Sequence, residues 1–229
     1  MAQQPARLTD PVAQVSHDAF WIFGYGSLIF KPPPGVQRAV PGYITGFVRR
    51  FWQQSHDHRG TPEAPGRVVT LVEREYWQTL GDPDDAPEGE HIWGVAYKIE
   101  PAQVPEVSAH LDLREQNGYT VHLVPFQPAD VAEAPSLPSI VYIGTPDNPA
   151  FTGVQPLDDL AATIYASHGP SGPNREYLYR LAESLDELAP ESRDLHIRAL
   201  AGRVRALETA AAAAGLAKQT GAVVAPPAP

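Results

Sequence analysis

Twenty-five prolines are spread through this chain of 229 residues, and they limit what it can fold into. A proline has no backbone N–H to donate, so it is tolerated mainly at strand edges, in turns and in the first turn of a helix. The apolar segments between the prolines are short. They predict short elements joined by long connections, around a core that a chain of this length can bury.

Short runs of β-branched and aromatic residues, each bounded by Pro, Gly or Asp clusters, occupy the first two thirds of the chain. We expect them to form strands of one sheet. The runs cover residues 19–23, 43–52, 68–72, 92–99, 119–126 and 139–144.

Apolar residues recur at helical spacing between Pro101 and Asn117 and again in the last third, over residues 157–167, 174–188 and 191–207. Helices gathered late in a chain that begins with strands predict the α+β class. We expect a mixed or antiparallel sheet, or a small β-barrel, with flanking helices and a helical C-terminal part.

The two ends of the chain have the composition of mobile tails. Residues 1–18 carry no apolar period, and residues 209–229 are rich in Ala and Pro. We therefore expect a single domain over residues 19–208. The acidic block GDPDDAPEGE, residues 81–90, predicts an exposed, mobile insertion between two strands.

Charge and composition exclude several classes of partner. A net charge of −10 argues against nucleic acid, which binds clustered Lys and Arg. No apolar run of about 18 residues and no signal peptide is present, so we expect no membrane association and a cytoplasmic protein. Zero cysteines exclude disulfides, Cys-based zinc sites and a cysteine nucleophile.

Two small clusters in the first third of the chain have residue types found in binding sites, but their patterns do not support a site. Arg49 and Arg50 are an isolated basic pair, which we interpret as a surface pair rather than a phosphate site. His56 and His58 lie two residues apart, but no third ligand follows at regular spacing. We expect no metal site there.

The segment Phe20–Ile29, FWIFGYGSLI, is an apolar run that breaks at Gly24 and Gly26 and continues into Ser27. Glycine has no Cβ, so it allows φ above zero or a close approach of a ligand to the main chain. Two glycines around one tyrosine leave several N–H groups able to converge on an anion. Two interpretations stay open: an oxygen-binding loop beside a cavity, and a tight turn that binds nothing.

Glu115, in LDLREQNGY, lies in the last turn of the first predicted helix, and Asp112 lies one turn earlier on about the same face. Two close carboxylates disfavour each other's ionisation, and burial does the same. A pKa raised in this way suits a group that accepts and returns a proton. The alternative is a solvated acid paired with Arg114.

Five further side chains have either two interpretations or a purely structural one. Arg59 and Arg67 precede a strand, and either orients a carboxylate through its guanidinium fork or pairs with an acidic loop. Tyr177 reaches a pocket with its phenol or is a core aromatic, which we favour. Ser171 and Asn174 directly precede a helix and predict side-chain caps.

Seven segments together resemble the ChaC-like γ-glutamylcyclotransferases, in particular their glutathione-specific branch. They follow the order of the family's blocks from about Phe20 to Leu207. The segments are WIFGYGSLIF, RRFWQ, HRGTPEAPGRVVTLVE, WGVAYKI, LDLREQNGY, YIGTPDNP and GPSGPNREYLYRLA. The chain departs from the family in its tails and in residues 81–90, a stretch that is longer than in many relatives.

The resemblance implies a small β-barrel with flanking helices and an enzyme that converts glutathione into 5-oxoproline and cysteinylglycine without a cofactor or metal. It implies that Glu115 is the catalytic acid/base. We add Arg59, Arg67 and Tyr177 as secondary substrate contacts. The resemblance further implies that the γ-glutamyl group is bound by Gly24, Tyr25, Gly26, Ser27, Leu28 and Ile29.

Three other functions remain to be distinguished. One is a cyclotransferase for γ-glutamyl amino acids or γ-glutamylamines. The second is a γ-glutamyl- or carboxylate-binding protein without turnover, against which the intact Glu115 argues. The third is a metal enzyme that uses His56 and His58. We expect glutathione as the partner, and a monomer or a weak homo-oligomer.

Overall fold

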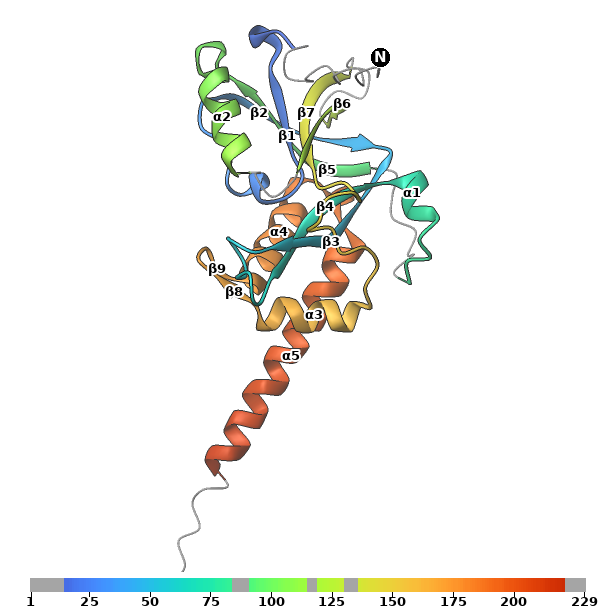
Figure 1. Cartoon of the computed structure of the whole chain (residues 1–229), viewed down its shortest axis with the longest axis vertical. Helices are drawn as coiled ribbons and strands as arrows, with labels where there is room; N and C mark the ends of the chain where they lie inside the picture. The colour runs from blue at the N-terminus through green and yellow to red at the C-terminus, as the bar shows by residue number, and fades with distance from the viewer. Residues whose placement is uncertain (1–14, 84–90, 115–118, 130–135, 221–229) are drawn as a thin grey trace, which may run out of the picture.

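A computed structural model describes residues 15–83, 91–114, 119–129 and 136–220 of the chain. Within this part, the strands form a closed barrel and two separate small sheets, and most of the helices gather on one side of the barrel (Figure 1).

Five strands close into the barrel in the order β1-β5-β2-β6-β7. Neighbouring strands are antiparallel except β1 and β7, which pair in parallel where Ile22 lies opposite Ile140 and so complete the ring. The barrel strands are β1 (Trp21–Gly24), β2 (Val36–Thr45), β5 (His91–Ile99), β6 (Thr120–Pro128) and β7 (Leu137–Ile143).

Strands β3 (Phe47–Ser55) and β4 (Gly66–Glu73) form a separate antiparallel sheet of two strands. The chain leaves the barrel at Gly46, whose φ of +85° lies in the left-handed region that favours glycine. The run predicted as one strand over residues 43–52 is therefore two strands in two sheets. The prediction that all strands share one sheet is wrong.

The helices cover both β units. Helix α2 packs its apolar face, including Val107 and Leu111, against barrel residues such as Ile22, while α3, α4 and α5 pack on one another and on the β3–β4 sheet. The predicted α+β architecture of a small barrel with flanking helices is confirmed. The helices are α1 (Arg74–Gln78), α2 (Val104–Arg114), α3 (Leu157–Ala166), α4 (Asn174–Leu188) and α5 (Leu195–Thr220), and a short hairpin of β8 (His168–Gly169) and β9 (Gly172–Pro173) precedes α4.

Helix α5 continues past Leu207, where the last predicted helix ends, and reaches Thr220. Residues 209–214 are exposed, and Figure 1 shows this end of α5 projecting away from the body. The segment predicted as a tail from residue 209 is thus helical as far as 220. The outermost residues, 1–14 and 221–229, lie outside the described part. Among the described residues, no helix is long and apolar enough to cross a membrane.

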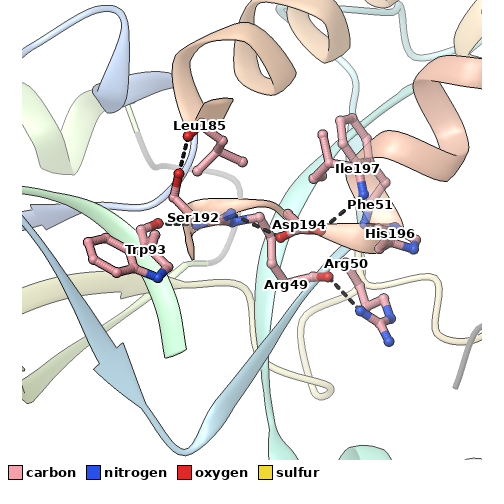
Figure 2. A network of polar contacts seen from close by, with 9 residues as sticks. All are labelled: Arg49, Arg50, Phe51, Trp93, Leu185, Ser192, Asp194, His196 and Ile197. Carbon is pink, nitrogen blue, oxygen red and sulfur yellow. Dashed lines mark hydrogen bonds and ion pairs between the residues drawn. The ribbon is translucent and has the colours of Figure 1, made fainter. Parts of the chain in front are cut away.

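The basic pair Arg49 and Arg50 is fully buried, so its interpretation as a surface pair is wrong. Arg49 forms an ion pair with Asp194 at 3.0 Å, and Arg50 forms one with Asp82 at 2.7 Å. Arg49 also donates to the main-chain oxygen of Trp93, as Figure 2 shows. These contacts join β3 both to the barrel and to the residue that precedes α5.

Asp82 belongs to the acidic block 81–90, which the sequence predicts to be exposed. Its carboxylate is instead buried, where it accepts hydrogen bonds from Arg50 and from the indole Nε1 of Trp77 at 2.8 Å. The prediction is wrong at this residue because the buried cation of Arg50 is stable only with a negative charge beside it. Residues 84–90 lie outside the described part.

Candidate active site

A cavity of about 160 Å³ lies where the barrel, the β3–β4 sheet and α4 meet. Its wall combines the loop after β1 with parts of β3, β4, β7 and α4, so segments far apart in the sequence build one site. The lining residues are Phe23, Tyr25, Gly26, Ser27, Leu28, Phe30, Lys31, Gln54, Ser55, Asp57, His58, Arg59, Val68, Val69, Tyr119, Tyr142, Ser171 and Tyr177.

The glycine loop after β1 reaches this cavity with part of its length. Tyr25 to Leu28 line it, whereas Gly24 and Ile29 do not. Residues Ser27–Ile29 form a 3₁₀ turn. The hydrogen bond of this turn runs from the N–H of Ile29 to the main-chain oxygen of Gly26 at 3.0 Å.

Close packing, rather than a positive φ, explains the two glycines of the loop. Neither has φ in the left-handed region. A Cβ on Gly24 would lie 2.6 Å from the Cβ of Leu28, and a Cβ on Gly26 would lie 2.8 Å from Cγ2 of Val69 and 3.1 Å from the Tyr177 hydroxyl. The loop is therefore pressed against both β4 and α4.

Two buried tyrosines fix the loop by hydrogen bonds. The hydroxyl of Tyr97 donates to the main-chain oxygen of Leu28 at 2.8 Å. The hydroxyl of Tyr25 donates to the main-chain oxygen of Tyr142 at 2.8 Å. Burial raises the pKa of Tyr97 to about 12. Its phenol therefore stays protonated and remains a donor at neutral pH.

Only some of the other predicted site residues line the cavity. Arg59 and Tyr177 line the cavity, and Tyr177 is also buried, as a core aromatic would be. Arg67 does not line it: its guanidinium donates to Gln155 and to two main-chain oxygens, and burial lowers its pKa. Glu115 lies outside the described residues.

Arg59 presents a largely buried cation to the cavity, with 12% of its side chain exposed. Its Nη1 donates to the main-chain oxygen of Pro173 at 3.1 Å and lies 3.8 Å from the carboxylate of Glu176. Burial lowers the pKa of Arg59, and the nearby carboxylate of Glu176 opposes this. An arginine nevertheless stays charged at neutral pH.

The predicted capping roles of Ser171 and Asn174 are wrong. Pro173 is the N-cap of α4, and no side chain caps the helix there. Asn174 instead binds both main-chain groups of Arg67, accepting from N at 2.6 Å and donating to O at 2.7 Å. The hydroxyl of Ser171 lies 3.3 Å from Nδ1 of His58 at the cavity.

Sequence reasoning missed much of the polar cavity wall. Lys31 lies two residues after Ile29, the end of the glycine loop, and that position was the one available signal for it. Tyr142 gave no signal, because strand periodicity reports burial and not proximity to a ligand. The missed polar residues are Lys31, Gln54, Ser55, Asp57, Tyr119 and Tyr142.

The described residues contain no group of three or more His, Cys, Asp or Glu side chains placed to hold a metal ion. His58, one of the two histidines considered for such a site, lies 3.9 Å from Asp57 and lines the cavity.

Comparison with known proteins identifies the family. Residues 20–207 match the model of the ChaC-like protein family. A Schizosaccharomyces pombe protein named glutathione-specific gamma-glutamylcyclotransferase is 43% identical over 82% of this chain and 93% of its own length. A Homo sapiens protein, glutathione-specific gamma-glutamylcyclotransferase 1, is 38% identical over 89% of this chain and 83% of its own length.

A solved structure agrees with these relatives. The crystal structure of a γ-glutamylcyclotransferase specific to glutathione from yeast is 39% identical in sequence and superimposes with a TM-score of 0.72, covering 82% of this chain and 98% of the yeast chain. The family model, the sequence relatives and the solved structure all extend over most of the chain. The chain therefore belongs to the ChaC-like family.

Proposed function

We propose that the protein degrades glutathione by cyclising its γ-glutamyl group to 5-oxoproline and releasing cysteinylglycine. The observation that carries this proposal is the 43% identity with a glutathione-specific γ-glutamylcyclotransferase over nearly that protein's whole length. The proposal is also supported by the cavity between the barrel, the β3–β4 sheet and α4, because part of the glycine loop lines it.

In this reaction the α-amino group of the substrate attacks its own γ-carbonyl carbon. A new C–N bond closes the five-membered ring, the amide C–N bond to cysteine breaks, and the proton lost by the attacking amine is balanced by one gained by the leaving amine. The chemistry needs no enzyme nucleophile. The protein's task is to hold the γ-glutamyl arm curled, with nitrogen and carbon about 3 to 3.5 Å apart.

The amides of Tyr25 to Leu28 supply the grip on the substrate in this proposal. They suit two substrate groups, the oxyanion that develops on the γ-carbonyl and the α-carboxylate, because both are anions that accept from converging N–H groups. The buried anchors Tyr97 and Tyr25 support the role, since donors that are already fixed cost no reorganisation during the reaction.

Glu115 is the acid/base of the proposed mechanism. It removes a proton from the attacking amine and returns one to the leaving amine. Helix α2 ends at Arg114, and Tyr119, four residues after Glu115, lines the cavity. Four residues of chain span at most about 14 Å, so the sequence position of Glu115 is compatible with this role.

Purified protein incubated with reduced glutathione tests the proposed function directly. We expect 5-oxoproline and cysteinylglycine in equal amounts by mass spectrometry, slower turnover of γ-glutamylalanine, and no change on adding a chelator. Faster turnover of γ-glutamylalanine would identify a cyclotransferase of different specificity. Binding of glutathione without products would identify a binding protein.

Gly26→Ala is expected to lower kcat/KM for glutathione about 10²-fold, the loss that follows a displacement of reacting groups by about 1 Å. The new methyl group would meet Val69 and the Tyr177 hydroxyl, so the loop must move. Steady-state kinetics measure the effect. The control is Gly202→Ala on α5, where an added Cβ meets nothing within 4 Å and turnover should not change. Equal activity of the two variants would contradict the role of the loop.

We also propose a cytoplasmic location, because a chain without cysteines fits a reducing compartment. The proposed assembly is a monomer or a weak homo-oligomer, which the sedimentation of the purified protein would test.

A further inference from the structure

The backbone around Arg59 is held tightly by glycines that lie close to it. A Cβ on Gly169 would lie 2.3 Å from the main-chain oxygen of His58, and a Cβ on Gly66 would lie 2.4 Å from that of Arg59. The main-chain N–H of Arg59 donates to the Ser55 hydroxyl at 3.0 Å. The position of Arg59 is therefore fixed from three sides before any ligand binds.

The guanidinium of Arg59 is held at one nitrogen. Both polar contacts of the side chain within the described residues, to Pro173 and to Glu176, use Nη1. The donors on Nη2 and Nε have no protein acceptor in this part of the chain, although little of the side chain is exposed and the residue lines the cavity. Such a fork matches the two oxygens of a carboxylate.

Arg59 and the glycine loop are separated by one tyrosine side chain. The guanidinium carbon lies 5.9 Å from the centre of the Tyr177 ring, and the Tyr177 hydroxyl is the group that an added Cβ on Gly26 would approach at 3.1 Å. The carboxylate of a dipeptide leaving group lies two residues from the reacting carbonyl, about 7 Å when extended. This length is of the order needed to extend past one tyrosine side chain.

Glutathione is an anion, so a cation in the cavity wall would favour its binding. Glutathione has two carboxylates and one ammonium group, and the chain has a net charge of −10, which repels an anionic substrate. Lys31 and Arg59 are the Lys and Arg side chains among the described lining residues. Lys31 is exposed, whereas Arg59 is largely shielded from water, where a charged hydrogen bond is stronger.

We infer that Arg59 binds the glycine carboxylate of glutathione and selects γ-glutamyl substrates whose leaving group ends in a carboxylate. This inference rests on the proposed function, because it assigns the leaving-group end of the same cavity. Glu176 competes weakly with the substrate for the guanidinium, since its carboxylate is 3.8 Å away and half exposed.

The test compares glutathione with its glycine amide, which lacks only that carboxylate charge. In wild-type protein we expect kcat/KM for glutathione to exceed that for the amide about 10- to 100-fold, as one hydrogen bond to a charged group allows. Arg59→Gln should remove this preference through a higher KM for glutathione, and Arg59→Lys should restore part of it. An equal loss with both substrates in Arg59→Gln would overturn the inference.

Two further variants keep the test decisive. Arg180→Gln removes the same charge from an exposed position near Arg59 that does not line the cavity, and it should change neither substrate more than about twofold. Glu176→Gln removes the competing carboxylate, and it should lower KM for glutathione about two- to fivefold and leave the amide unchanged. If Arg59→Gln does not fold, an unchanged KM in Glu176→Gln overturns the inference.

The outcomes separate this inference from the proposed function. Wild-type protein that forms no 5-oxoproline from either substrate contradicts the proposed function itself. Wild-type protein that cyclises glutathione and its amide equally well contradicts the role of Arg59 alone.

Discussion

Glu115→Gln is expected to lower kcat for glutathione about 10²- to 10⁴-fold, the loss typical of removing a general acid/base. An amide has the shape of the carboxylate but cannot take the proton from the attacking amine. Turnover measured as 5-oxoproline gives the effect, and thermal unfolding shows whether the variant keeps its fold.

The control for Glu115→Gln is Glu106→Gln, the same chemical change at an exposed position in the first turn of α2. We expect full turnover from this variant, because its side chain is not part of the cavity wall among the described residues. Full 5-oxoproline production by a folded Glu115→Gln protein would refute the acid/base role and leave the fold assignment untouched.

Asp194→Asn is expected to lower the free energy of unfolding by about 3 to 5 kcal/mol, the cost of leaving a buried charge without its partner. The carboxylate and Arg49 are 7% and 1% exposed and lie 3.0 Å apart. Figure 2 shows that Asp194 also faces Ile197: its Oδ1 accepts from that N–H at 3.0 Å and so caps α5. Denaturant unfolding measures the loss.

Two further variants separate the ion pair from the cap. Asparagine caps a helix about as well as aspartate, so Asp194→Asn tests the charge, and Asp194→Ala should cost about 1 kcal/mol more because it removes the cap as well. Asp158→Asn breaks an exposed pair with Arg203 and should cost less than about 1 kcal/mol. A loss in Asp194→Asn as small as that in Asp158→Asn would contradict a buried, paired charge.

Features decided by neighbouring residues were predictable from the sequence. The leucines of α4 repeat at helical spacing, and Leu178, Leu181 and Leu185 are buried as that spacing predicts. The glycine loop was found because glycines next to an apolar run mark a close approach. The structure adds which atoms approach, namely Val69 and the Tyr177 hydroxyl at Gly26.

Features decided by distant residues were not predictable in the same way. Arg49 has the sequence pattern of a surface residue, and its partner Asp194 is 145 positions away. Tyr25 donates to a residue 117 positions away. The division into barrel and β3–β4 sheet depends on one backbone conformation at Gly46, which composition does not reveal. The role of Glu115 stays a prediction.

The location of the cavity links the concentration of substrate to the stability of the folded protein. A ligand held between the barrel, the β3–β4 sheet and α4 binds only while all three are assembled, so it favours the folded state over the unfolded state. At a concentration 100 times the dissociation constant this linkage contributes about 2.7 kcal/mol. Abundant glutathione would thus protect the protein proposed to consume it, and depletion would expose that protein to unfolding and proteolysis.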